Sequence, residues 1–187
     1  MKVLLLNGSR REKGCTYTAL SEVAQTLINQ GIEAEVIHAV PNVEVIKEVA
    51  EKVKTADGIV VGSPVYWASP SGEVIEFMDK LSSMAGKFLL HKPGAAIASA
   101  RRAGTTATID VLTKYFTYHQ MPVVSANYWS MVHGNTPEEV KKDAEGMQIM
   151  RVLGNNMAWL LKCIEVGKNA GIKAPETEAK IMTNFIR

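Results

Sequence analysis

Hydroxyl, guanidinium and thiol side chains gather near the start of the chain, directly after a short apolar run. The run covers residues 3–6, and residues 7–16 read Asn-Gly-Ser-Arg-Arg-Glu-Lys-Gly-Cys-Thr. Apolar residues then recur at helical spacing from Leu20 to Ile28. A strand, a glycine-rich hydroxyl loop and a helix together direct backbone N–H groups and a helix N-terminus at an anion. The stretch therefore predicts a phosphate site.

Polar and aromatic side chains also follow three later apolar runs. The stretches are Ser-Pro-Val-Tyr-Trp-Ala at residues 63–68, Ala-Arg-Arg-Ala-Gly at 100–104, and residues 127–135. In an open parallel sheet, ligands bind beyond the carboxyl ends of the strands. One flat, anionic and partly aromatic ligand would fit these loops together with the first.

The elements that must position these loops alternate along the chain. Apolar runs predict five strands, at residues 3–6, 34–39, 59–62, 93–99 and 123–126. Helical patterns lie between them. A third helix is expected to start at Ser69-Pro70, an N-cap followed by proline at the first position, and Thr136 caps a later one. That last helical pattern runs on past residue 160, with a break near Gly146. This alternation predicts an α/β fold with helices on both faces of a parallel sheet.

Composition limits the function classes. The chain has 187 residues, a net charge of +2 and two cysteines, Cys15 and Cys163. An even charge balance argues against nucleic acid and anionic membranes as partners. No stretch approaches the ~20 apolar residues of a membrane span. We expect a soluble cytoplasmic protein with one domain at residues 1–167 and a tail at 168–187. The tail would hold at most a short helix that packs on the domain or on a partner subunit.

Three other phosphate motifs fit poorly. The dinucleotide fingerprint is absent, because the next glycine after Gly8 is Gly14. A Walker loop would need one residue fewer between these glycines, and a lysine where Cys15 stands. A phosphatase with a nucleophilic cysteine would need an arginine soon after Cys15, where the sequence has Tyr-Thr-Ala-Leu.

The loop at residues 7–16 resembles the FMN-phosphate loop of the NADPH-dependent FMN reductases, and residues 62–68 look like that family's second flavin loop. The resemblance continues through residues 128–134 to the final helix. It implies a flavodoxin-like three-layer sandwich with a five-stranded parallel sheet in the order 2-1-3-4-5. Related iron–sulfur flavoproteins carry a compact cysteine motif between the second and third strands. Residues 41–57 hold no cysteine here, so no such cluster and no other metal are expected.

The same resemblance implies roles for particular residues. The phosphate would be held by Ser9, Arg11, Cys15 and Thr16. The ring and ribityl chain would be wrapped by Pro64, Val65, Tyr66 and Trp67. The pyrimidine end would be read by Ser99, Ala100, Arg101 and Gly104. Apart from the resemblance, the candidate walls of the substrate pocket are Tyr128, Trp129 and His133. The alternatives are subunit-interface positions for Tyr128 and Trp129 and a packed loop position for His133.

The implied reaction is transfer of a hydride from NAD(P)H to FMN, and of electrons onward to a flavin, quinone or similar acceptor. The flavin N5 carries the chemistry, so no catalytic side chain is expected. The resemblance also implies a homodimer or homotetramer. A non-enzymatic electron carrier of the flavodoxin type is the alternative, although such carriers tend to be strongly acidic.

Several conspicuous residues have plainer explanations. Cys15 is interpreted as a small residue tolerated where backbone groups bind, and not as a reactive thiol. His119 lies in a helical pattern and is expected to be structural. Trp159 lies in the apolar pattern of the last helix, where packing would explain it.

Overall fold

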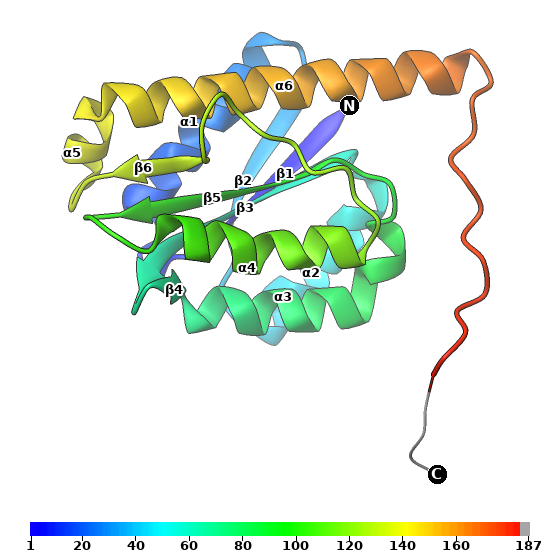
Figure 1. The fold of residues 1–187 in the computed structure, drawn as a ribbon, viewed down its shortest axis with the longest axis horizontal. Coiled ribbons are helices and arrows are strands. Elements are labelled where there is room, and N and C mark those ends of the chain that lie inside the picture. The colour runs from blue at the N-terminus through cyan, green and yellow to red at the C-terminus, as the bar shows by residue number, and fades with distance from the viewer. Residues whose placement is uncertain (184–187) are drawn as a thin grey trace.

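A parallel sheet lies between two layers of helices in the computed structural model, which describes residues 1–183 (Figure 1). Its strands are β1 (Lys2–Asn7), β2 (Glu33–His38), β3 (Gly58–Tyr66), β5 (Gly94–Ala100) and β6 (Met131–His133). They are ordered β2-β1-β3-β5-β6, and β4 (Ser69–Pro70) pairs only with β3. Counting the parallel strands alone, this confirms the expected order 2-1-3-4-5.

Successive side chains of each strand enter opposite cores. Val3 and Leu5 of β1 pack against α1 (Cys15–Asn29) and α6 (Ala144–Asn169). Leu4 and Leu6 pack against the opposite layer. That layer consists of α2 (Val43–Thr55), α3 (Gly72–Ala85) and α4 (Thr105–Tyr118). Because both faces are covered, the strands read as continuous apolar runs.

The last helical stretch is divided by an aspartate. After the cap at Thr136, α5 (Pro137–Lys142) ends at Asp143, which then caps α6 by accepting a hydrogen bond from the Gly146 N–H at 2.9 Å. The break was expected near Gly146 and lies three residues earlier, since the Asp143 carboxylate can satisfy the first N–H groups of a new helix. A short 3₁₀ turn, η1 (Gly86–Phe88), follows α3.

The prediction of the fifth strand at residues 123–126 was wrong. Val123 forms only an isolated bridge with Gly94, and 44% of its side chain is exposed. The chain then leaves the sheet and returns as β6, where Met131 pairs with Ala98. Periodicity detects a local apolar run. Whether that run pairs with β5 depends on contacts between segments that are distant in sequence, so the run alone does not predict the strand.

The start of the third helix was also misplaced. Ser69 and Pro70 form β4, and the N-cap of α3 is Ser71, whose hydroxyl accepts from the Val74 N–H at 3.2 Å. Two serines two residues apart offered equivalent caps. Pairing of Ser69 with Tyr66 across a tight turn decides between them.

No helix within residues 1–183 is long and apolar enough to cross a membrane. The final helix runs to Asn169, and residues 170–183 form neither helix nor strand. The short helix allowed for in the tail is thus absent from this part, and the rest of that prediction concerns residues 184–187, which lie outside the described chain.

Candidate functional site

A cleft of about 210 Å³ opens at the carboxyl ends of the parallel strands. It is lined by Ser9, Arg11, Cys15, Thr16, Pro64, Val65, Tyr66, Ser99, Ala100, Arg101, Gly134 and Asn135. The structure therefore brings together all the predicted cofactor residues except Trp67 and Gly104. Their roles in binding stay predictions, but their meeting in one cleft is a property of the fold.

The first loop is held in shape from inside. Asn7, fully buried at the end of β1, donates from its amide to the Glu12 carbonyl at 2.8 Å and accepts from the Ser9 N–H at 3.2 Å. The Ser9 hydroxyl accepts from the Arg11 N–H at 3.1 Å. These bonds fix the backbone just before α1, whose N-cap, Gly14, makes no side-chain cap bond. The first N–H groups of a helix have no intrahelical partner, so they are free to bind an anion here.

The charges around this loop separate into two groups. Arg11 lines the cleft. Arg10 instead forms an ion pair with Glu73 on α3, and its guanidinium lies 5.2 Å from the centre of the Tyr66 ring. That ion pair raises the pKa of Arg10. Of these two arginines, Arg11 is the one placed to attract a phosphate.

Neighbouring loops are joined to the first one by hydroxyl groups. The Ser71 hydroxyl donates to the Gly8 carbonyl at 2.6 Å. A side chain at Gly8 would collide with Val74, since an added Cβ would lie 2.4 Å from it. Thr16 and Ser99, both buried, share a hydrogen bond of 2.8 Å. The walls of the cleft are therefore positioned relative to one another before any ligand binds.

The thiol of Cys15 lies at the start of α1, 3.6 Å from the Gly134 carbonyl. Partial burial is the largest influence on it and raises its pKa. A raised pKa keeps the thiol protonated, and the thiolate is the reactive form. This agrees with the interpretation of Cys15 as a small wall residue.

Trp67 occupies the tip of a two-residue hairpin between β3 and β4. Its φ is +51° and that of Ala68 is +56°, the left-handed pair that such hairpins use. The indole is fully exposed and does not line the cleft. Gly104, also outside the lining, has φ +95°, and an added Cβ would lie 2.7 Å from Val65 and Ala68. Gly104 thus lets α4 approach the hairpin closely.

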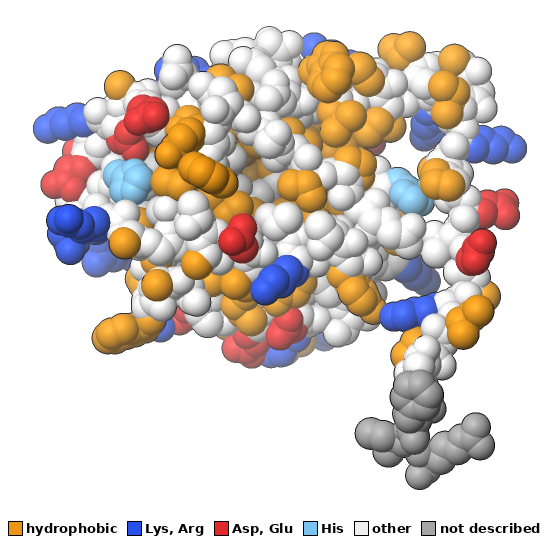
Figure 2. Space-filling view, in the orientation of Figure 1, with side chains coloured by type: hydrophobic (Ala, Val, Ile, Leu, Met, Phe, Trp, Pro, Cys, Tyr) orange, Lys and Arg blue, Asp and Glu red, His pale blue; other side chains and the backbone are white. Residues whose placement is uncertain are grey.

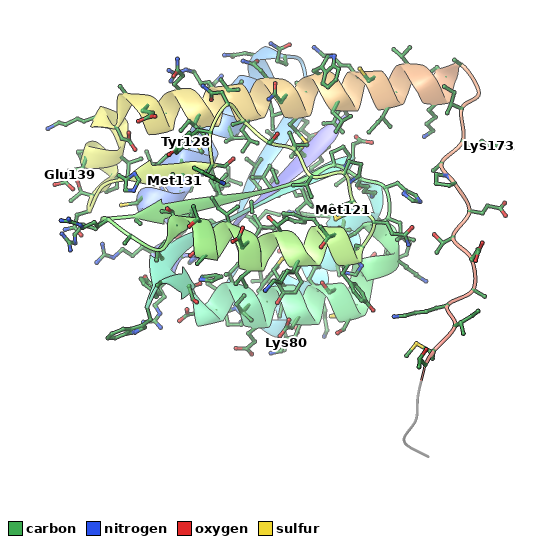
Figure 3. All side chains as sticks on the ribbon, in the orientation of Figure 1. Lys80, Met121, Tyr128, Met131, Glu139 and Lys173 are labelled. Carbon is green, nitrogen blue, oxygen red and sulfur yellow. The ribbon has the colours of Figure 1, made fainter. Side chains whose placement is uncertain are left out.

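The three residues predicted as substrate walls are not in the cleft lining. Tyr128 lies on the excursion between α4 and β6 (Figure 3). It is followed by Trp129, the two residues are 52% and 56% exposed, and their rings lie 4.8 Å apart. Apolar side chains gather on this face of the molecule (Figure 2). His133 contacts the Arg102 carbonyl through Nε2 at 3.1 Å. Their substrate role stays a prediction.

Three residues of the site were not among those predicted: Asn7, Gly134 and Asn135. Asn7 belongs to the first loop, but no role was predicted for it. An asparagine at the end of a strand is a recognisable signal, because its amide can hydrogen-bond the backbone of the loop that follows. Gly134 and Asn135 line the cleft beside Cys15. Both residues directly precede the capping signature at Thr136. That signature predicts the start of a helix, but it does not indicate that the residues before it line the cleft.

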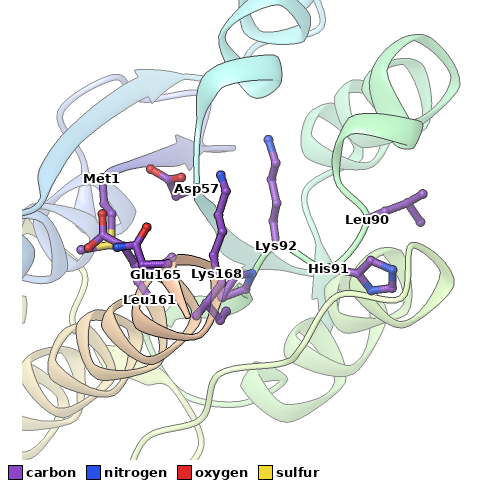
Figure 4. A pocket seen from close by; sticks show the side chains of 11 residues that line it. Met1, Asp57, Leu90, His91, Lys92, Leu161, Glu165 and Lys168 are labelled. Atoms are coloured by element: carbon purple, nitrogen blue, oxygen red, sulfur yellow. The ribbon is translucent and has the colours of Figure 1, made fainter. Parts of the chain in front are cut away.

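A second cavity, of about 240 Å³, lies at the opposite end of the sheet (Figure 4). It is bordered by Met1, Asp57 and Lys92, which precede β1, β3 and β5, and by Lys168 of α6. The Lys92 ammonium donates to the Val53 carbonyl at 2.6 Å, and burial lowers its pKa. Ligands of open α/β sheets bind at the other edge, so the cleft above remains the candidate.

Comparison with known proteins agrees with this geometry. The fold is flavodoxin-like: a flavodoxin, WrbA-like protein from Agrobacterium tumefaciens has a TM-score of 0.69 at 18% identity, over 87% of this chain and 97% of its own. The structure of RosB with bound 8-demethyl-8-formylriboflavin-5′-phosphate has a TM-score of 0.73 at 15% identity, over 99% and 92%.

The family model of the NADPH-dependent FMN reductases matches residues 1–136, so the chain belongs to that family of flavin-dependent oxidoreductases. An iron–sulfur flavoprotein of Methanocaldococcus jannaschii is 30% identical over 88% of this chain and its own full length. An NADPH azoreductase of a Bacillus species is 31% identical over 54% of this chain and 59% of its own.

The residues present fit an FMN phosphate but not an iron–sulfur cluster. The uncapped start of α1, Arg11 and the hydroxyls of Ser9 and Thr16 form a cradle for an anion. A cluster of the kind bound by four cysteines needs four thiolates. The whole chain has two cysteines, one in the cleft and one exposed at position 163 on α6.

Proposed function

We propose that the protein is an FMN-dependent NAD(P)H oxidoreductase. The observation that carries the proposal is the cleft itself. The hydrogen-bonded loop before α1 lies beside the ends of β3 and β5, in a chain of the FMN reductase family. When bound, FMN would accept a hydride at N5 and pass electrons onward.

Each wall has a distinct task. The backbone before α1, with Arg11, would bind the phosphate. The segment Pro64–Tyr66, held by the β3–β4 pairing, would support the ring and ribityl chain. Arg101 and the backbone near Ser99 would donate hydrogen bonds to the pyrimidine end, where reduction places negative charge. No acid or base is needed among these residues.

The electron acceptor would be a diffusible molecule such as a flavin, a quinone or an azo compound. The chain lacks the thiolates for a cluster that could receive the electrons, and similarity to an azoreductase supports a small organic acceptor. We also propose that the protein works as a homodimer or homotetramer.

Anaerobic mixing of the FMN-loaded protein with NADH or NADPH tests this function. Rapid loss of the visible flavin absorption, followed by its return on adding a quinone or azo dye, is the expected result. If the absorption persists with both dinucleotides, the protein is an electron carrier of the flavodoxin type. Arg11→Gln is the matched variant, since it should weaken FMN binding without removing a residue of the core.

A further inference from the structure

The chain continues past α6 as an extended segment, here called the arm, residues 170–183 (Figure 1). Every residue of the arm is exposed, including Ile181 at 93% and Met182 at 70%. A described contact between the far end of the arm and the domain runs through Lys180, whose ammonium lies 3.3 Å from the Tyr118 hydroxyl. Two adjacent apolar side chains that lie mostly in water gain free energy by reaching an apolar surface.

Tyr118 borders a cleft of about 530 Å³ between α3 and α4. Its walls include the apolar Ile75 and Val111 and the aromatic Tyr115. Two polar atoms beside it, Ser82 Oγ and His119 Nε2, are buried without a hydrogen-bond partner among the described residues. An unpaired buried polar group is unfavourable, and an extended peptide carries free backbone groups that can pair with it.

The charges of the arm and of this cleft are complementary. Asp79 and Lys114 stand at the cleft, and Glu178 and Lys180 stand on the arm. The apolar end of the arm, Ile181 and Met182, lies in water in a single copy of the chain.

We propose that the arm of one copy docks on a second copy of this chain, with Ile181 and Met182 in the cleft between α3 and α4. A second copy is the occupant because the arm keeps its apolar side chains in water beside its own domain, although it already touches Tyr118 at the edge of that domain's cleft. In a two-fold dimer the exchange is reciprocal, so each contact is made twice. Docking of the arm does not depend on the flavin chemistry.

Cysteine cross-linking in the full chain tests the docking. Cys163→Ser removes an exposed thiol, and Ile181→Cys is combined with Ser83→Cys, whose side chain lines the cleft. Mild oxidation should give a band of twice the monomer mass, with a 181–83 disulfide identified by mass spectrometry. The control pair is Ile181→Cys with Ile28→Cys, an exposed position on α1. A 181–83 bond within one chain, absence of that bond, or equal cross-linking of the control pair would overturn the proposal.

Sedimentation equilibrium supplies an independent measurement. Met182→Asp should raise the dimer dissociation constant by about tenfold or more, the effect of losing one buried apolar side chain. Ile28→Asp, an equally drastic change on α1, should leave it unchanged. A dimer that is indifferent to Met182→Asp refutes the arm contact, while the flavin proposal would stand unaffected.

Discussion

The side-chain oxygens of Thr16 and Ser99 lie 2.8 Å apart, so one hydrogen bond joins the first turn of α1 to β5. Both residues are buried, at 1% and 3% exposure. The bond connects the loop that would hold a phosphate to the strand end that would contact the ring. The strength of this bond can be measured from its contribution to the free energy of unfolding.

Breaking this bond from either side should cost similar amounts of stability. Thr16→Val or Ser99→Ala leaves the other hydroxyl buried without a partner, at a cost of about 1–3 kcal/mol. The double variant should lose less than the sum of the two, because no orphaned hydroxyl remains. Urea unfolding of all four proteins measures the coupling, and strictly additive losses would mean that the bond does not form.

The protein should prefer FMN to riboflavin. The uncapped start of α1 and Arg11 are arranged for a phosphate, which riboflavin lacks. Fluorescence titration with each flavin measures the preference. Equal affinities for FMN and riboflavin would show that this loop does not bind the phosphate.

Ser9→Ala should weaken FMN binding by roughly ten- to a hundredfold, the worth of a charge-assisted hydrogen bond. The hydroxyl also accepts from the Arg11 N–H at 3.1 Å, so its removal loosens the loop. Ser21→Ala is a suitable control, because the Ser21 hydroxyl donates only to the Tyr17 carbonyl, one turn earlier in α1, and does not line the cleft. Calorimetric titration measures both affinities. If the two variants bind FMN equally well, Ser9 only stabilises the turn and does not bind the phosphate.

Trp67→Ala should slow turnover while leaving FMN affinity and stability nearly unchanged. The indole is fully exposed beside the cleft, where it can meet a dinucleotide or an acceptor but does not line the flavin cradle. Trp159→Ala is the matched control, since that tryptophan is 66% exposed on α6. Both changes should alter unfolding free energy by only about 0.5 kcal/mol. Equal steady-state rates in the two variants would show that Trp67 has no part in the reaction.

His119 should make the protein less stable in mild acid. Burial lowers the pKa of His119 in the folded protein. Between this pKa and the higher pKa of the unfolded chain, the unfolded chain is protonated at His119 and the folded protein is not. Stability is thus full above about pH 6.5 and falls as the pH drops toward the folded-state pKa, by about 1.4 kcal/mol per pH unit. Denaturation midpoints of His119→Gln between neutral and acid pH should show a shallower decline, and His91→Gln serves as control. An unchanged slope in His119→Gln would contradict the assignment.

The sequence alone determined the layers of the fold and the edge of the sheet at which its polar loops meet, and the family resemblance of those loops pointed to most of the cleft residues. Continuous apolar runs such as residues 3–6 indicate strands covered on both faces, and loops after such runs must meet at one edge. The loops that carry Ser9, Tyr66 and Arg101 were therefore expected at one edge of the sheet, and the cleft contains all three residues. This part of the prediction succeeded because the burial and the direction of a strand can be inferred locally, from the periodicity of apolar residues and the position of polar ones.

Only the tertiary structure decided where individual side chains point. A left-handed turn at Trp67 and Ala68 aims the indole into water, and pairing of β3 with β4 imposes that turn. The excursion before β6 carries Trp129 away from the cleft lining, and Trp159, expected in the core, lies on the exposed side of α6. Each outcome depends on contacts between segments distant in sequence, whose free energy no local pattern records.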